Sequence, residues 1–372
     1  MNSSQTTKRF RSSARRVIMT ALCVTMAALL MLTCTQCKPA KPEETKPEET
    51  AAETPTAAEP TEPQVDLTFD TPNIPDDGTD GYLSSVDQGV YIFKNAAYEL
   101  CGASDEAGKD YAAAISEFKK AAPDLTVYNI VVPTHVEFGL PARVAGETYT
   151  ASQSQNIKTI YTNYSADIKP INVYNALCRH KDEYVYFNTD HHWTGLGAYY
   201  AYQAFCEQTG QTPLALTDCT EKTVDGFEGS FFDTDSSLTT DTVHYWEFPY
   251  QTHARRQDES NGEMVDASVY YEGAEGSGAY ITFIQGDSPL FIEYNDENKN
   301  GKKIAVVKES FGNAFVPYLT NNYEEVHIID FRYFTNNLKN YMTENGITEV
   351  LFLNNTMSAN AAVQVDRIRE LI

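Results

Sequence analysis

The chain has 372 residues, with 28 basic and 52 acidic side chains and a formal charge of −24 at pH 7. Binding along a nucleic-acid backbone needs a basic surface, so this balance argues against a nucleic-acid-binding protein. With 42% hydrophobic residues, 24 Tyr and 18 Phe, the chain can build a packed core and is not disordered as a whole.

An apolar run at residues 17–32 follows a basic stretch that includes Arg15 and Arg16. This order is typical of an export signal. The run is shorter than the roughly 20 residues of a transmembrane helix, so residues 1–37 are predicted to be a cleaved signal peptide or a retained membrane anchor. Since basic flanks stay in the cytoplasm, the remainder is predicted to be extracytoplasmic and to meet the membrane through its N-terminus only. Cys34 and Cys37 follow the run as candidate lipidation sites of a bacterial lipoprotein, although neither follows the small-residue pair of a lipobox.

Residues 38–85 are rich in Pro, Glu and Thr and contain the string KPEET twice in tandem. Such a segment cannot bury enough apolar surface to offset its conformational entropy, so it is predicted to be a disordered linker. The folded domain is predicted to span residues 86–372.

Helical and strand patterns alternate along this domain, which predicts an α/β fold with a parallel sheet covered by helices on both faces. In such a sheet, ligands bind at the carboxyl ends of the strands. Thr194 is the predicted N-cap of the third helix. Helices are predicted at 111–121, 154–165, 194–207 and 358–371, and strands at 90–93, 125–132, 171–173, 184–187, 303–308, 326–329 and 347–353.

Residues 212–300 interrupt this alternation and are rich in Gly, Ser, Thr, Asp and Tyr. They are predicted to form an inserted β-rich region or long loops, with strand-like stretches at 268–271 and 279–284. Their tyrosines are candidates either for stacking on sugar rings or for core packing: Tyr245, Tyr250, Tyr270, Tyr271 and Tyr280. The domain also holds four cysteines, for which disulfides and free thiols are both open: Cys101, Cys178, Cys206 and Cys219.

Two segments carry the candidate chemistry. In an extended segment, side chains two residues apart point the same way, so Asp190 and His192 can reach one crevice, where the carboxylate would orient the imidazole as a general base. Ser310 follows the strand 303–308, at a turn where backbone N–H groups can stabilise an oxyanion. Gly312 permits close backbone approach there. Together Ser310, His192 and Asp190 are a candidate nucleophile, base and orienting acid, although each residue alone also fits an ordinary capping or structural role.

The string DEYVYFNTDHHWTGLGAYYAY resembles the signature of the DHHW protein family, and KESFGNAFVPYL with EEVHIIDFRYF resembles its second block. The resemblance covers most of residues 90–372. It implies an SGNH-hydrolase-like fold related to the alginate O-acetylation proteins AlgX and AlgJ, in which an Asp-x-His pair and a later Ser form a triad. That implies Asp190, His192 and Ser310. Glu309 departs from the Asp expected before the serine.

The oxyanion asparagine of SGNH enzymes has no certain counterpart, and Asn313, Asn354 and Asn355 are the candidates beside Gly312. The tripeptide Gly286-Asp287-Ser288 spells the GDS of simpler esterases. Pro289 follows it at once within the irregular region, whereas the Ser of those esterases follows the first strand and precedes a helix, so Ser288 is not taken as the nucleophile.

The sequence therefore predicts a cofactor-free, metal-free serine acyltransferase or esterase that acts on a polysaccharide of the bacterial cell envelope. The family resemblance adds an MBOAT-type membrane protein as a partner that supplies acetyl groups. One alternative is a non-catalytic glycan-binding or assembly lipoprotein. The other is a metal-dependent phosphoesterase that uses Asp190, His191 and His192 as ligands.

Overall fold

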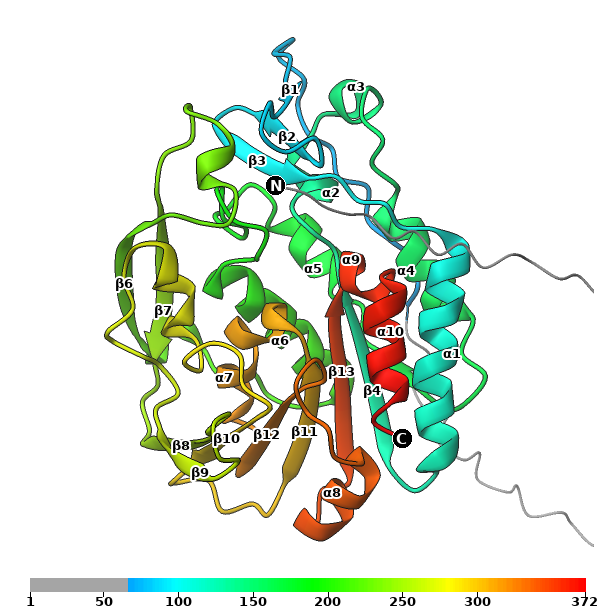
Figure 1. Ribbon diagram of the computed structural model, residues 1–372, viewed down its shortest axis with the longest axis vertical. Helices are drawn as coiled ribbons and strands as arrows, with labels where there is room; N and C mark the ends of the chain where they lie inside the picture. The colour runs from blue at the N-terminus through cyan, green and yellow to red at the C-terminus, as the bar shows by residue number, and fades with distance from the viewer. Residues whose placement is uncertain (1–65) are drawn as a thin grey trace, which may run out of the picture. The chain divides into compact units, whose positions relative to one another are not determined.

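The computed structural model describes residues 66–372 (Figure 1). The predicted signal or anchor, the candidate lipidation sites Cys34 and Cys37, and residues 38–65 of the predicted linker lie outside the described residues. Among residues 66–372, no helix combines the length and the apolar composition that crossing a membrane requires.

An eight-stranded sheet forms the centre of the fold, in the order β5-β4-β13-β11-β12-β10-β8-β9. The first five strands in this order are parallel, and the last three join antiparallel. The predicted α/β fold is therefore confirmed, with a mixed sheet. The parallel strands are β5 (Lys169–Pro170), β4 (Thr126–Val132), β13 (Glu349–Asn355), β11 (Lys303–Lys308) and β12 (Glu325–Asp330), and the antiparallel strands are β10 (Leu290–Asn295), β8 (Thr252–Gln257) and β9 (Met264–Ala267).

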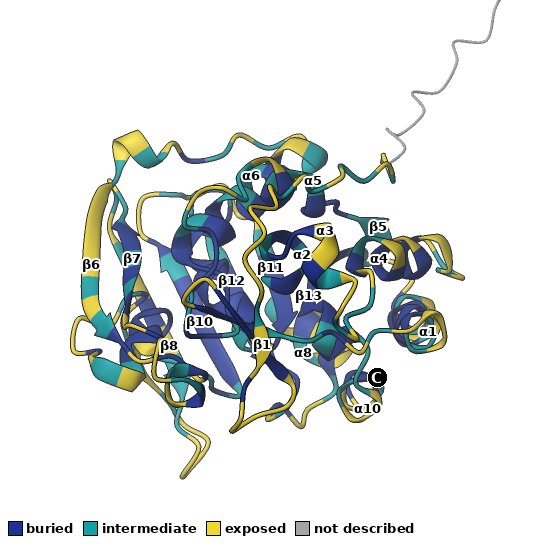
Figure 2. Cartoon of the chain, turned by 90° about the horizontal axis from the view of Figure 1, so that it is seen from above, coloured by how far each residue is buried: buried dark blue, intermediate teal, exposed yellow. Residues whose placement is uncertain are grey.

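Helices cover both faces of the parallel strands, which explains why β11 and β13 are almost continuously apolar and buried. Figure 2 shows α5 (Tyr174–Arg179) and α6 (Gly195–Thr209) on one side of β11, β12 and β13 and α8 (Leu338–Asn345) and α10 (Ala362–Arg369) on the other. α6 begins at the predicted cap, where the Thr194 side chain accepts the N–H of Gly197, and it ends at Gly210 in the left-handed conformation. The other helices are α1 (Asp105–Ala121), α2 (Val136–Gly139), α3 (Ala142–Ala145), α4 (Gln153–Thr162), α7 (Val316–Leu319) and α9 (Thr356–Ala359).

The region 212–300 is rich in strands, as predicted, but much of it extends the main sheet, because β8, β9 and β10 are its last three strands. β6 (Thr220–Phe227) and β7 (Asp241–Glu247) form a separate hairpin. The stretches 268–271 and 279–284 are not strands. They share one bridge, between Tyr270 and Phe283, and Gly276–Thr282 is a 3-10 helix, η3. The other 3-10 helices are η1 (Leu216–Asp218), η2 (Phe232–Thr234) and η4 (Ser310–Ala314).

Three further predictions differ from the structure. The segment 184–187 makes a single bridge, from Tyr186 to Trp193, because the chain turns back between these two residues. The strand expected at 171–173 is the shorter, earlier β5. The closing helix is divided into α9 and α10, because the Asn360 side chain bonds to the Thr356 carbonyl and ends α9.

Residues 66–85 belong to the folded part, although their composition led to their assignment to the linker. Leu67 and Phe69 pack against the core, and Asp70 forms a 3.0 Å ion pair with Arg179. β1 (Tyr82–Leu83) pairs with β2 (Val90–Phe93), which pairs with β3 (Ala96–Glu99). A few apolar residues supply the burial that the average composition of the segment concealed. All four cysteines of the described domain are free.

Candidate active site

Ser310 lies at the carboxyl edge of the parallel sheet, where β11 ends and η4 begins. The turn is tight. A Cβ atom on Gly312 would lie 2.6 Å from Cβ of Lys308, so only glycine fits there. The sequence thus places a serine where the chain must reverse within a few residues of a buried strand.

Residues 188–193 form the second part of the site, in the loop between α5 and α6. Trp193 is fully buried, and its Nε1–H donates a 2.8 Å hydrogen bond to the carbonyl of Phe311. This bond ties the histidine-bearing loop directly to the turn of Ser310. Trp193 is thus both a core residue and a link between the two motifs.

Ser310, His192 and Asp190 form a continuous hydrogen-bonded series. Nε2 of His192 lies 2.8 Å from Oγ of Ser310, and Nδ1 lies 2.5 Å from Oδ1 of Asp190. The backbone N–H of His192 also donates to Oδ1 at 3.0 Å. With Nδ1–H donating to the carboxylate, Nε2 carries the lone pair that can accept the serine proton.

The environment of Asp190 favours its charged form. Burial works against ionisation, but the adjacent His192, through its charge and its hydrogen bond, outweighs burial and lowers the pKa of Asp190. An ionised carboxylate beside Nδ1 fixes the imidazole tautomer and stabilises an imidazolium.

Tyr280 completes the wall around His192. Its ring stacks on the imidazole with centroids 4.0 Å apart and planes inclined by 15°, and its hydroxyl donates to the Ser310 carbonyl at 3.0 Å. Burial, followed by the charges of Asp190 and Glu309, raises the pKa of Tyr280. Tyr280 therefore contacts the triad directly and is buried. Of the other tyrosines considered for sugar stacking, Tyr245, Tyr250 and Tyr270 pack against or within the core, and Tyr271 is exposed.

The inserted region holds the Asp190 loop in place, a role that the sequence analysis did not find. The N–H of Ser230 donates to Oδ2 of Asp190 at 2.9 Å. Buried Asp241 accepts four hydrogen bonds from Asn188 and Thr189, two from backbone N–H groups and two from side chains. The only sequence signal was an Asp and a Ser in an otherwise irregular region.

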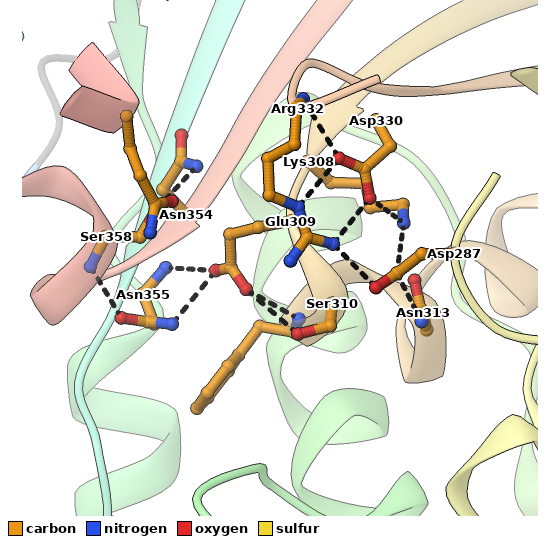
Figure 3. A network of polar contacts seen from close by, with 12 residues as sticks. Asp287, Lys308, Glu309, Ser310, Asn313, Asp330, Arg332, Asn354, Asn355 and Ser358 are labelled. Atoms are coloured by element: carbon orange, nitrogen blue, oxygen red, sulfur yellow. Dashed lines mark hydrogen bonds and ion pairs between the residues drawn. The ribbon is translucent and has the colours of Figure 1, made fainter. Parts of the chain in front are cut away.

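The candidate oxyanion residues are engaged within the protein. The N–H of Gly312 donates to the carbonyl of Glu309, and the amide of Asn313 donates to Asp287 at 3.1 Å. The side chain of Asn354 accepts from Tyr111 and donates to Ser358. Figure 3 shows the contact between Asn313 and Asp287.

Asp287 and Ser288 of the GDS tripeptide have separate roles. Ser288 is buried and donates to the carbonyl of Leu290. Asp287 pairs with Lys308 at 3.0 Å and with Arg332 at 2.7 Å, at the ends of β11 and β12. Burial opposes its ionisation, but the charges of Lys308 and Arg332 lower the pKa of Asp287. The tripeptide thus supplies an ion-pair partner near the site.

Asp190, His191 and His192 offer donor atoms within 4.8 Å of one another, close enough to hold a metal ion. Both ring nitrogens of His192 and both oxygens of Asp190 already have hydrogen-bond partners, and Nδ1 of His191 lies 2.8 Å from Oγ of Ser230. A metal would have to displace this series. The residues present therefore fit a proton-transfer series better than a metal centre.

The chain is thus an α/β protein of the class that carries a hydrogen-bonded Ser–His–Asp series at the carboxyl edge of its parallel strands. Within that class, the chain belongs to the DHHW family: the family model described as DHHW protein matches residues 60–329. A DHHW family protein from Eubacterium siraeum is 32% identical, with 78% of this chain and 98% of that chain covered and a TM-score of 0.70.

One more distant solved structure shares this fold, and another is only weakly similar. PatB1 from Bacillus cereus is 21% identical over 73% of this chain and 97% of its own, with a TM-score of 0.61, and a second PatB1 structure carries a sulfonyl adduct. The O-acetyltransferase domain of Pseudomonas putida AlgJ is 11% identical over 78% of this chain and 98% of its own, with a TM-score of 0.43. Among curated proteins, none matches this chain.

Proposed function

We propose that this protein is an extracytoplasmic serine acyltransferase or esterase that adds acetyl groups to a cell-envelope polysaccharide or removes them. The observation that carries the proposal is the unbroken series from Ser310 Oγ through both nitrogens of His192 to Asp190. A serine hydroxyl is a weak nucleophile without an adjacent base, and this series supplies the base and its orienting carboxylate. Family membership and the export-signal pattern of residues 1–37 support the polysaccharide substrate and the extracytoplasmic location.

In the proposed reaction, Ser310 Oγ attacks the carbonyl carbon of an acyl ester while Nε2 of His192 takes the hydroxyl proton. The resulting imidazolium is stabilised by Asp190. Collapse of the tetrahedral intermediate breaks the ester bond, and His192 returns the proton to the leaving alkoxide. A sugar hydroxyl or a water then attacks the acyl-serine by the same steps, which makes the protein a transferase or an esterase.

The N–H of Ser310 is the proposed backbone donor for the oxyanion. The first N–H groups of a helix have no partner within it, and Ser310 is the first residue of η4. The donors of Phe311 and Gly312 are both taken by Glu309. If the protein is a transferase, the proposed acetyl donor is an MBOAT-type membrane protein, which would deliver acetyl groups across the membrane.

The test is covalent labelling of the full-length protein. A sulfonyl fluoride is a suitable reagent, since PatB1 carries a sulfonyl adduct in one structure. We expect a single adduct on Ser310, hydrolysis of p-nitrophenyl acetate, and the loss of both in Ser310→Ala and His192→Ala. Mass spectrometry after incubation with an acetyl donor should show one acetyl group on Ser310. A protein that binds glycan equally well in all variants but is never labelled would be a non-catalytic glycan-binding lipoprotein instead.

A further inference from the structure

Glu309, the residue directly before the proposed nucleophile, is buried and accepts hydrogen bonds from the turn of Ser310 and from the end of β13. Its Oε2 accepts the N–H of Phe311 at 2.9 Å, and its Oε1 accepts both the backbone N–H of Asn355 at 2.9 Å and the Asn355 side-chain amide at 3.0 Å. Ser310 Oγ lies 3.5 Å from Oε2. Figure 3 shows the carboxylate between the Ser310 turn and Asn355.

These contacts join the carboxyl ends of two neighbouring parallel strands. Glu309 follows β11, and Asn355 is the last residue of β13. Asn355 is also the N-cap of α9, where its Oδ1 accepts the N–H of Ser358 at 2.9 Å. The turn that carries Ser310 is therefore hydrogen-bonded to Asn355, where the adjacent strand β13 ends and α9 begins. The turn cannot rotate independently of Asn355.

The chemistry at this position requires a carboxylate. Three N–H donors converge on the two oxygens of Glu309, and an ionised carboxyl is an acceptor only. A glutamine would direct its NH₂ group at one of these donors and leave a buried N–H without an acceptor. Burial raises the pKa of Glu309, while the hydrogen bonds from Phe311 and Asn355 act in the opposite direction and favour the anion.

We infer that Glu309 is a positioning residue of the nucleophile, which holds the turn so that Ser310 Oγ faces Nε2 of His192. The inference rests on the proposed function for its catalytic meaning. The geometry separates the two roles: Oγ is 2.8 Å from the imidazole but 3.5 Å from the carboxylate. The hydroxyl proton is thus directed to His192, while Glu309 uses its stronger contacts to fix the backbone.

The experiment compares the wild-type protein with Glu309→Gln and with Glu309→Asp, which keeps the charge on a side chain that is one methylene shorter. We expect kcat for p-nitrophenyl acetate and the rate of sulfonyl labelling to fall about 10- to 100-fold in both variants, with KM changed less than about twofold. The free-energy cost of leaving one buried donor unpaired corresponds to about one to two tenfold decreases in rate. In the double variant Glu309→Gln with Asn355→Asp, the new carboxylate at position 355 can accept a hydrogen bond from the glutamine NH₂ group. The double variant should therefore recover part of the rate that Glu309→Gln loses.

A crystal structure of Glu309→Gln provides a readout that does not depend on activity. The inference predicts that the Ser310–His192 contact lengthens beyond hydrogen-bond distance. If Glu309→Gln keeps both that contact and the wild-type rate, the inference is overturned while the proposed function stands. If wild type is never acylated or sulfonylated but the contact is lost in the variant, the proposed function fails and the positioning role stands. If Glu309→Gln does not fold, the same two readouts on Glu309→Asp decide between these outcomes.

Discussion

The backbone N–H of Ser230 donates a 2.9 Å hydrogen bond to Oδ2 of Asp190, across 40 residues of sequence. This bond occupies the carboxylate oxygen that does not face His192. The inserted region therefore orients the acid of the proposed triad. Its neighbour Gly229 allows the approach, since a Cβ atom there would lie 2.5 Å from Cβ of Asp190.

This contact predicts a severe effect of Gly229→Ala. The added methyl group must push the segment away from Asp190, at a cost of about 1–3 kcal/mol in the free energy of unfolding, and the rate of sulfonyl labelling should fall with it. Thermal unfolding and labelling measure the two effects. Gly102→Ala is the matched control, since a Cβ at Gly102 meets nothing within 4 Å. Equal behaviour of the two variants would show that the close approach is unimportant.

Asp190→Asn should lower kcat by about 10⁴-fold without unfolding the protein. The amide can still accept from Ser230, but it no longer holds the Nδ1–H tautomer of His192 that leaves Nε2 free to accept the serine proton. Steady-state kinetics with p-nitrophenyl acetate and circular dichroism check the two halves of this expectation. Asp266→Asn, on the exposed part of β9, should behave as wild type. A residual rate within tenfold of wild type would rule out the orienting role of Asp190.

Tyr280 should act mainly through its ring. Tyr280→Phe removes the bond to the Ser310 carbonyl but keeps the ring on His192, so kcat/KM should fall by less than about tenfold. Tyr280→Leu also removes the aromatic face beside the imidazolium that forms in the reaction, and this contact is worth about 0.5–2 kcal/mol. The kcat/KM of Tyr280→Leu should therefore fall further than that of Tyr280→Phe. Kinetics of both variants, with melting temperatures to monitor packing, make the comparison. If Tyr280→Phe lowers kcat/KM as much as Tyr280→Leu does, the role belongs to the hydroxyl group and not to the ring.

Glu293 predicts a pH dependence of stability. This side chain in β10 is buried, and neither of its oxygens has a hydrogen-bond partner among residues 66–372. Burial raises the pKa of Glu293 well above 4.5. Above about pH 4.5 the unfolded chain releases this proton first and the folded protein retains it. The free energy of unfolding should therefore decrease with rising pH, by at most about 1.4 kcal/mol per unit from this group.

Glu293→Leu removes the buried carboxyl and should raise the free energy of unfolding at pH 8 by about 1–3 kcal/mol, with a smaller gain at pH 5. Urea unfolding at both values measures the difference. Glu259→Gln, at an exposed glutamate, should leave both values unchanged. A Glu293→Leu protein that is less stable than wild type at pH 8 would contradict this account.

The sequence by itself identified four of the five parallel strands, β4, β11, β12 and β13, and the residues at their ends. The apolar runs that became β4, β11 and β13 are local patterns, since strands buried on both faces must be apolar throughout. Ser310 was recognisable because it directly follows such a strand. Asp190 and His192 were recognisable because their separation of two residues lets both side chains reach one crevice.

The tertiary structure alone decided which distant residues complete the site. Ser230, Asp241 and Tyr280 lie in the inserted region, and they reach Asp190, Thr189 and Ser310 across separations of 30 to 52 residues. Periodicity reports only which face of an element is buried. The approach of two loops depends on the register of the whole sheet, in which β10 and β8 bring the inserted region beside β12, and no local pattern encodes that register.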